Sequence, residues 1–465
     1  MKNRFSVNKL FRSVVCTVLA VVMLALCACN GGGEEQQPSE QESTLLVRVV
    51  KAKEDTAAGS FFGITALETV EVDASTVPEG YLAKTTDAVG RKLLADVKAG
   101  DIITDSMLEK KTSSKEEPEE ELDAETAKAK GYVVVTDYIR INSRKDVSAE
   151  LQKIIDENPM RTIYFPDGEY ILAKPICTSG KPETAVSLQL SNFAVLKAAD
   201  GWDHTEAMVR LGAAEPYNTI YRNGSNYSFA GGIVDGNGVA NGISIDSGRE
   251  TSIRNVSIKH TFIGIHIKRG ANNGSSDADI ETVNIVGNNK KGSVGVLIEG
   301  YDNTLTNMRI AAIEVGIKLR SGGNCLRNIH PLFIYGYEYA EDDINFEDSI
   351  AFLEEVSGTN WYDYCYSDQM ATGYKLIPGS KAVIVNAFIM WYSPRGNKEV
   401  GFQCDGDFNA SITNPKIHFR GDTTNNAVLV LPEGAGGHGF IDNPIIDDNL
   451  VTDKTYKKFV TGRII

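Results

Sequence analysis

Two short apolar patterns recur in a fixed order along the C-terminal two thirds of the chain. The first opens on glycine and alternates apolar with outward residues, as in GISID at 242–246, GIHIK at 264–268, GVLIE at 295–299 and GIKLR at 316–320. The second follows about a dozen residues later and sets an asparagine or threonine between two apolar residues. Alternation with a period of two predicts strands that bury one face.

The asparagine or threonine of the second pattern forms a series through the repeats: Asn255, Thr282, Asn307, Asn328, Asn386, Asn414 and Asn443. A fixed register of strand patterns predicts one coil per repeat, with coils stacked at about the 4.8 Å strand spacing. Asparagines stacked in this way can bond along the column. We therefore predict an all-β fold, a right-handed parallel β-helix over residues 131–465. A β-sandwich would instead show hairpin turns every ~8–12 residues.

The start of this region fits the same fold. Residues 146–155 have helical spacing and are expected to cap the open end of the coil, and residues 162–171 read as a strand broken by a Pro-Asp-Gly turn. Together with GGIVDGNG at 231–238, this pattern resembles the first coils of the pectate-lyase-like superfamily, which includes polygalacturonases. The resemblance covers roughly 131–450 and implies a carbohydrate-binding surface along the first sheet.

A separate small domain is predicted at 44–111. Residues 58–68 and 99–109 echo each other as a glycine turn, a short strand and a Thr-initiated helical turn. This stretch resembles the SAF domain, a small β-clip fold that occurs in pilus-assembly and flagellar chaperone proteins and in some sugar-acid enzymes. An acidic low-complexity linker is expected at 112–130.

The N-terminal residues have the pattern of an export signal. Basic residues precede an uncharged apolar run at 14–28, too short for a comfortable transmembrane span, so 1–28 is predicted to be a signal peptide. LCAC at 26–29 resembles the bacterial lipobox, which implies lipidation at Cys29 and attachment to the bacterial cell membrane, facing the extracellular or envelope side. Residues 29–43 are expected to be a flexible tether. A plain signal peptide or an uncleaved anchor stays open as an alternative.

Composition narrows the function classes. The 465 residues carry a formal net charge of −15, which argues against a nucleic-acid partner because phosphate contacts need a basic surface. None of the exported cysteines has CxxC spacing, and we expect mostly buried thiols rather than a zinc or redox site. These cysteines are Cys177, Cys325, Cys365 and Cys404.

Candidate chemistry lies on the outward positions of the glycine-led strands. One outward column is Ser244, His266, Leu297 and Lys318, and the other is Asp246, Lys268, Glu299 and Arg320. We assign the second column as catalytic candidates and Asp235, His266 and Lys318 as substrate-binding candidates. Two carboxylates two coils apart stand roughly 10 Å apart, at the wide end for an inverting glycosidase. Cations there suit uronate carboxylates or an enolate-like charge. The alternative is that opposite charges on neighbouring strands neutralise each other.

The polygalacturonase pattern is incomplete. Those enzymes carry Asn-Thr-Asp, Asp-Asp, Gly-His-Gly and Arg-Ile-Lys on successive coils, whereas here only the last is echoed and Gly-His-Gly occurs late, at 437–439. No cofactor is required by the sequence. A Ca²⁺ site at Asp277, Asp279 and Glu281 is a weaker candidate, with a solvated acidic turn as its alternative.

Two functional hypotheses follow. The first is a cell-surface lipoprotein whose β-helix binds a polysaccharide. This hypothesis includes cleavage of the polysaccharide, as a lyase or a glycoside hydrolase. The second is a non-catalytic envelope-assembly or adhesion protein that uses the SAF domain and the β-helix as binding surfaces.

Overall fold

The computed structural model describes residues 46–109, 122–178, 184–212, 227–269, 275–334, 343–392, 396–421 and 424–464. The chain divides into two compact units, residues 1–118 and 119–465. The expected signal peptide at 1–28, Cys29 and the tether at 29–43 lie outside the described residues, as does the linker up to residue 121.

The first unit is a small β domain. Strands β1 (Leu46–Ala52) and β2 (Leu67–Asp73) pair antiparallel, and isolated bridges tie β1 and the loops to residues 92–108. Four 3₁₀ helices complete it: η1 (Ile64–Ala66), η2 (Ala74–Thr76), η3 (Thr85–Asp87) and η4 (Asp105–Met107). η1 and η4 lie in the two echoing segments, at the positions where helical turns were expected. A compact core that includes Val50, Phe62, Leu93 and Ile103 holds the loops together.

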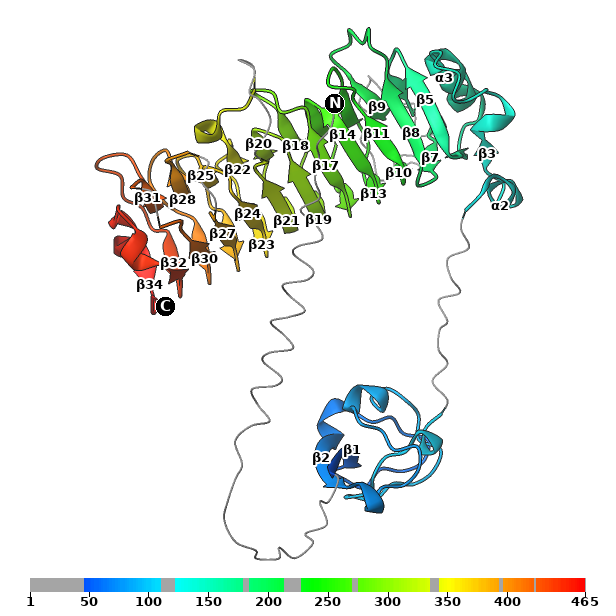
Figure 1. Ribbon diagram of the computed structural model, residues 1–465, viewed down its shortest axis with the longest axis vertical. Coiled ribbons are helices and arrows are strands. Elements are labelled where there is room, and N and C mark those ends of the chain that lie inside the picture. The colour runs from blue at the N-terminus through cyan, green and yellow to red at the C-terminus, as the bar shows by residue number, and fades with distance from the viewer. Residues whose placement is uncertain are drawn as a thin grey trace, which may run out of the picture. The chain divides into compact units, whose positions relative to one another are not determined.

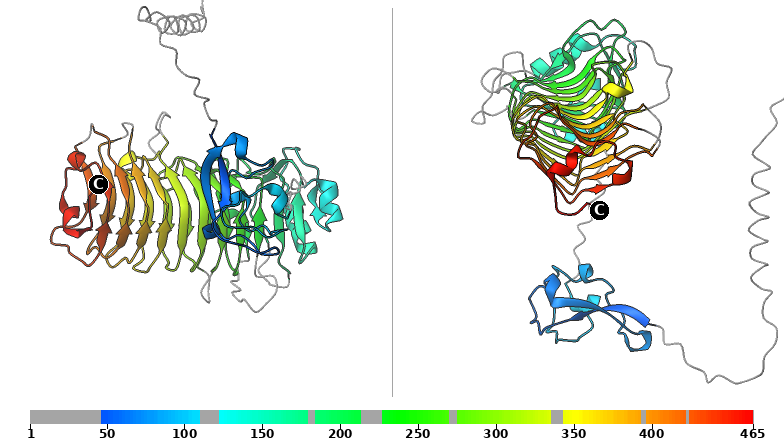
Figure 2. Two further views of the ribbon diagram at one scale, coloured as in Figure 1. Left: turned by 90° about the horizontal axis from the view of Figure 1, so that it is seen from below. Right: turned by 90° about the vertical axis from the view of Figure 1, so that its left-hand side faces the viewer.

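The second unit is a parallel β-helix whose coils stack side by side along one axis (Figures 1 and 2). Each regular coil passes through three parallel sheets, here called sheet 1, sheet 2 and sheet 3 in the order of the chain. β19 (Thr304–Ala311) and β21 (Cys325–Leu332) run through sheets 2 and 3 without a break, which joins these two into one 22-stranded hydrogen-bonded sheet.

The strands of sheet 1 are β6 (Ile176–Cys177), β9 (Ala207–Leu211), β12 (Asn241–Ile245), β15 (Ile263–Ile267), β18 (Val294–Ile298), β20 (Val315–Leu319), β22 (Ile350–Glu354), β25 (Thr372–Leu376), β28 (Glu399–Cys404) and β31 (Asn426–Val430). Sheet 2 holds β3 (Val133–Val134), β4 (Thr162–Phe165), β7 (Ser187–Leu190), β10 (Ser228–Ala230), β13 (Ser252–Arg254), β16 (Asp279–Glu281), β23 (Trp361–Asp363), β26 (Val383–Val385), β29 (Ser411–Thr413), β32 (Phe440–Asp442) and β34 (Val460–Thr461). Sheet 3 holds β5 (Gly168–Leu172), β8 (Ala194–Ala198), β11 (Ile233–Asp235), β14 (Ser257–Thr261), β17 (Asn284–Gly287), β24 (Tyr366–Asp368), β27 (Phe388–Met390), β30 (Lys416–His418) and β33 (Ile445–Ile446). The predicted parallel β-helix is thus confirmed.

Close stacking of the coils explains the glycine near the start of the sheet 1 strands β12, β15, β18, β20, β25 and β28. A Cβ on Gly264 would lie 2.6 Å from the carbonyl oxygen of Gly295, and a Cβ on Gly295 would lie 2.4 Å from that of Gly316. Real Cβ atoms do not approach an oxygen so closely, so a larger residue would push the coils apart. The glycine pattern in the sequence therefore marks the start of sheet 1.

The asparagine series marks the turn from sheet 2 to sheet 3. Every member of the predicted column has a positive φ, between 47° and 55°, a left-handed conformation that asparagine tolerates better than most residues. Tyr364, with φ of 54°, fills the same turn in a coil that the pattern missed. Side-chain bonds along this exposed column are intermittent: Asn328 donates to Asn307 at 2.9 Å, and Asn414 to Asn386 at 3.5 Å.

A second, fully buried asparagine ladder lies at the turn from sheet 1 to sheet 2. Asn303 donates through its backbone and side-chain N–H groups to Asn324 Oδ1 at 3.1 and 2.9 Å, and Asn324 donates in the same way to Asn360 Oδ1 at 3.0 Å. All three side chains have no exposed surface. The ladder satisfies backbone groups that would otherwise be buried without partners.

The interior is filled by residues of like shape stacked coil upon coil. The inward positions of sheet 1 carry Ile243, Ile265, Val296 and Ile317 and then change to stacked rings. Ring centroids of Phe352 and Tyr374 are 4.7 Å apart, and those of Tyr374 and Phe402 are 5.3 Å apart.

Helix α3 (Ser148–Glu157) closes the N-terminal end, as predicted, by burying Leu151, Ile154 and Ile155. The expected linker, in contrast, ends too late. Its last residues form helix α2 (Ala124–Ala129), which is capped by Asp123 and packs Ala127 against Val134 and Tyr164. The alanines of this charged stretch provide an apolar contact that its composition concealed. The 3₁₀ helices of this unit are η5 (Val135–Asp137), η7 (Phe346–Asp348), η8 (Asp448–Leu450) and η9 (Thr455–Phe459).

One carboxyl group lies inside the coil. Glu354 ends β22, has no exposed surface, and accepts hydrogen bonds from Tyr362 Oη at 2.8 Å, Asn360 Nδ2 at 3.2 Å and Ser380 Oγ at 2.5 Å. Burial raises the pKa of Glu354, and these three bonds only partly offset it.

We predict that Asn324→Ala destabilises the β-helix by about 2–4 kcal/mol, because it leaves the buried backbone N–H of Asn303 without its acceptor and removes the side-chain bonds to Asn303 and Asn360. Asn328→Gly is the matched control: it removes an exposed ladder bond but keeps the left-handed turn, and should cost less than about 1 kcal/mol. Urea unfolding curves measure both. Equal losses in the two variants would show that the buried ladder has no special role.

The raised pKa of Glu354 predicts a pH-dependent stability. The folded chain binds this proton more tightly than the unfolded chain, so the Glu354 contribution falls as pH rises above the ordinary glutamate value of about 4.3. Glu354→Gln should therefore unfold at a higher temperature than the wild type at pH 7, with the difference shrinking toward pH 4. Glu355→Gln is the control of opposite sign, because ion pairs lower the pKa of Glu355. A less stable Glu354→Gln variant at pH 7 would contradict the prediction.

Candidate functional site

The two outward columns of sheet 1 stand in the register expected from the sequence. Backbone pairing sets Ser244 beside His266, His266 beside Leu297, and Leu297 beside Lys318. The second column follows each strand end, where the N–H groups of Lys268, Glu299 and Arg320 each donate to the preceding coil. The structure therefore brings His266, Lys318 and all four catalytic candidates onto one face.

The first cluster on this face is centred on Asp246, which is 7% exposed. Its Oδ2 accepts from Arg210 Nε at 2.7 Å and Nη2 at 2.6 Å. Its Oδ1 accepts from Ser244 Oγ at 2.5 Å and lies 3.0 Å from Lys268 Nζ. Both oxygens are thus engaged by side chains of neighbouring coils.

The second cluster is a chain of charged contacts across four coils. His266 Nε2 lies 2.9 Å from Glu299 Oε2, and Arg320 Nη1 lies 2.9 Å from Glu299 Oε1. Arg320 Nε also donates to Glu355 Oε2 at 2.8 Å, and Lys318 Nζ lies 2.8 Å from Glu355 Oε1. Opposite charges on neighbouring strands favour each other in this arrangement.

The pKa shifts favour a neutral imidazole at His266 and ionised carboxylates at Glu299 and Glu355. Burial lowers the pKa of His266 more than Glu299 raises it, which favours the neutral imidazole at neutral pH. For Glu299, burial acts to raise the pKa, but hydrogen bonds from His266 and Arg320 outweigh it and the pKa is lowered. The pKa of Glu355 is lowered in the same way, with Lys318 and Arg320 outweighing burial.

The geometry gives His266 a defined chemical role. If Nε2 carries the proton toward Glu299, the lone pair is on Nδ1, which makes no hydrogen bond to a described residue. The imidazole is about one fifth exposed. A neutral histidine oriented by a carboxylate is the arrangement that enzymes use for proton abstraction.

Two members of this face were missed by the sequence reasoning. Arg210 lies on β9, beside Ser244, and Glu355 directly follows β22; in these two strands Met208 and Ala351 occupy the place of the leading glycine. The motif AFLEE at 351–355 is the glycine-led pattern with alanine substituted, and allowing small residues at that position would have found Glu355.

Asp235 does not belong to this face. It lies on β11 in sheet 3, where its Oδ1 is 2.9 Å from His260 Nδ1 and accepts the Asn237 N–H at 2.9 Å. Asp235 therefore does not share the sheet 1 face with His266 and Lys318. The glycines before it form the turn from sheet 2 to sheet 3, so the strand that follows belongs to sheet 3 and not to sheet 1.

The acidic residues proposed for Ca²⁺ are engaged elsewhere. Asp277 bonds Arg249 Nε at 2.8 Å and Asp279 bonds Arg254. Asp279 and Glu281 lie on strand β16 rather than in a turn. Within the described ranges no three His, Cys, Asp or Glu side chains gather as a metal site requires. Since arginines bind two of these carboxylates, the residues present do not fit a Ca²⁺ site.

Of the four expected thiols, Cys365 and Cys404 are buried, whereas Cys177 is partly exposed and Cys325 is exposed. Among the helices that the structure describes, none is long and apolar enough to cross a membrane.

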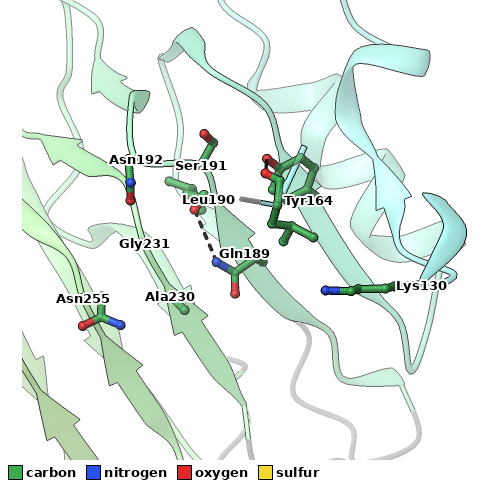
Figure 3. A pocket seen from close by; sticks show the side chains of 10 residues that line it. Lys130, Tyr164, Gln189, Leu190, Ser191, Asn192, Ala230, Gly231 and Asn255 are labelled. Atoms are coloured by element: carbon green, nitrogen blue, oxygen red, sulfur yellow. Dashed lines mark hydrogen bonds between the residues drawn. The ribbon is translucent and has the colours of Figure 1, made fainter. Parts of the chain in front are cut away.

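A separate recess of about 540 Å³ lies on the asparagine column near the N-terminal end. It opens where Gly231, with φ of 79°, stands in the left-handed turn in place of the asparagine of other coils. Figure 3 shows Lys130 reaching in from one side and Asn255 from the other, with Gln189 between them. The lining has amides and one ammonium group but no carboxylate or imidazole, so it suits binding rather than acid–base chemistry.

Comparison with known proteins identifies both units. Residues 47–109 match the SAF domain, and residues 132–331 match the family described as rhamnogalacturonase A/epimerase, pectate lyase-like. The chain thus combines a SAF domain with a pectate-lyase-like β-helix, as its sequence patterns suggested.

Solved structures share the fold at low identity. The surface adhesin PfbA of Streptococcus pneumoniae is 12% identical, with a TM-score of 0.41 over 67% of this chain and 90% of that one. An alginate lyase from Paenibacillus is 12% identical, with a TM-score of 0.42 over 63% and 97%. The tailspike of E. coli bacteriophage HK620, in complex with a pentasaccharide, is 12% identical, with a TM-score of 0.49 over 73% and 64%. A search among curated proteins returns no match.

Proposed function

We propose that this protein is a cell-surface lipoprotein whose sheet 1 face binds an acidic polysaccharide and cleaves it by β-elimination. The observation that carries the proposal is the pairing of His266 with Glu299 beside Lys268, Lys318 and Arg320. The family match adds support, because its description names a rhamnogalacturonase and an epimerase, both of which act on sugars.

Elimination from a uronate needs a base for the proton beside the carboxylate and cations for the charge that develops. His266 supplies the base through Nδ1, with Glu299 as the positioning residue behind it. Lys268, 30% exposed, lies two residues after His266 in the same coil and can face the uronate carboxylate. The electron pair of the C5–H bond forms the C4–C5 double bond as the C4–O bond breaks, and the departing sugar oxygen takes a proton from water.

Hydrolysis fits this face less well. A glycosidase needs one carboxylic acid with a raised pKa beside a second carboxylate. Glu299 and Glu355 both have lowered pKa values, and both oxygens of Asp246 are occupied by Arg210, Ser244 and Lys268. Neither glutamate of this face therefore has the raised pKa that a general acid requires.

A second candidate function is binding without cleavage, as an adhesin or an envelope-assembly protein with the SAF domain as the assembly module. The observation that favours it is the pairing of every cation in the two columns with a carboxylate. Such pairs stabilise stacked coils without any ligand. In this case sheet 1 would bind a glycan and release it unchanged.

The sheet 1 proposal predicts a specific kinetic loss in His266→Gln. On polygalacturonate, alginate and rhamnogalacturonan, the wild type should form unsaturated products that absorb ultraviolet light. The variant should lower kcat by about 10²-fold or more with little change in KM, since a general base contributes about 10²–10⁴-fold. Activity of the wild type should rise as pH rises through the lowered pKa of His266 and be fully developed at neutral pH.

His260→Gln is the matched control, because His260 also pairs with a carboxylate but lies on sheet 3. It should leave turnover unchanged. Formation of no unsaturated product from any of the three polysaccharides would rule out the lyase. If glycan binding then still weakens in Lys268→Gln, the binding-only function is the correct one.

Anchoring through Cys29 is part of the same proposal and rests on the LCAC sequence at 26–29. Cys29→Ala should abolish incorporation of labelled palmitate and move the protein from the membrane fraction to the soluble fraction of expressing cells. Cys27→Ala is the control and should leave lipidation intact. Labelling that persists in Cys29→Ala would contradict lipidation at Cys29.

A further inference from the structure

Sheet 3 carries a second surface that is built differently from sheet 1. Its first outward column is Ser257, Asn284, Arg309 and His330, and its second is Lys259, Val286, Ala311 and Leu332. The two columns line a recess of about 290 Å³ across strands β14, β17, β19 and β21.

Two of the three basic groups of this recess are unpaired. Its lining includes Lys259, Arg309 and His330 but no aspartate or glutamate. Lys259 and Arg309 form no ion pair within the part of the chain that the structure describes, whereas the sheet 1 cations are all paired. The whole chain has a net charge of −15, so two unpaired cations make this recess positive on an otherwise acidic protein.

An apolar column of the floor adjoins these cations. Val286, Ala311 and Leu332 stand side by side in one column and are each half-buried. Lys259 and Arg309 are separated by one strand, which places their backbones roughly 10 Å apart. A ring with an apolar face and charged edges fits a floor of this kind with cations at its margins.

We propose that this recess is a second glycan-binding site, for an acidic oligosaccharide whose carboxylate or sulfate groups bind Lys259 and Arg309. Val286, Ala311 and Leu332 pack against the apolar face of a sugar ring, and Asn284 lies at the polar rim. The site does not rest on the function proposed for sheet 1, since it shares none of its residues and lies on another sheet.

His330 limits the ligand at the far end of the recess. Its Nε2 lies 3.2 Å from Asp368 Oδ2, and its ring stacks on Tyr366 with centroids 4.0 Å apart. Tyr366 stacks in turn on Phe388 at 4.8 Å. These ring faces cover one another and are not open to bases, and Asp368 would repel a continuous phosphate backbone. Both features favour a short acidic glycan over a nucleic acid.

The test uses the full chain with sheet 1 disabled by Lys268→Gln and Arg320→Gln, so that remaining binding reports sheet 3. Isothermal titration with trigalacturonate and with a sulfated disaccharide should show one site per chain with at least one of them, which also tells carboxylate from sulfate. Adding Lys259→Gln and Arg309→Gln should weaken this binding about tenfold or more, since bonds between charged groups are removed. Added salt should weaken it as well.

Lys153→Gln with Lys381→Gln, in the same background, removes equal charge from exposed positions outside sheets 1 and 3 and should leave binding unchanged. Circular dichroism checks that each variant is folded. The proposal is overturned if the background protein binds neither probe, if neutral trigalactose binds equally well, or if Lys259→Gln with Arg309→Gln has no effect. Binding at sheet 3 is measured in a protein whose sheet 1 site is already disabled. A failure of the sheet 1 proposal therefore does not affect the test of the sheet 3 site.

Discussion

Backbone hydrogen bonds between successive coils hold the strands of the β-helix in strict parallel register. Because each residue bonds to its equivalent one coil away, every position along the coil becomes a column of side chains about 4.8 Å apart. Each side chain must therefore pack against the side chains at the same position in the coils above and below it. Glycines stack where backbones approach, rings stack on rings, and opposite charges alternate on the outside.

The same constraint decides how polar groups survive inside the coil. A buried polar group can find a partner only in its own turn or in the coils beside it, because no water reaches it. Asn303, Asn324 and Asn360 meet this condition by bonding along the stack. Glu354 meets it only partly: three donors approach it, yet burial still raises its pKa. The buried asparagine column thus stabilises the fold, and the neighbouring Glu354 carboxyl makes its stability depend on pH.

The sequence revealed most of the fold because its constraints are local and repeated. Left-handed turns select asparagine and close coil contacts select glycine, so both columns could be read by spacing alone. The buried ladder was missed because it spans only three coils, although each of its asparagines stands four residues before the left-handed turn. Asp235 lies on a different face from His266 and Lys318, because the two glycines before it form the turn from sheet 2 to sheet 3. The linker concealed α2, since its alanines matter only through a contact with Tyr164. On sheet 1 the column positions followed from the pattern, but the ion pairs that Arg210 and Glu355 contribute did not.

Charge distinguishes the two outward faces. On sheet 1 each cation has a carboxylate partner and one neutral imidazole is left with an open nitrogen, whereas on sheet 3 two cations border an apolar floor without partners. The most direct test of the central claim is a crystal structure of the His266→Gln variant with a bound uronate oligosaccharide. The account predicts a sugar along sheet 1 with a carboxylate at Lys268 and its C5 facing residue 266. An oligosaccharide seen only elsewhere on the molecule, with sheet 1 empty, would contradict it.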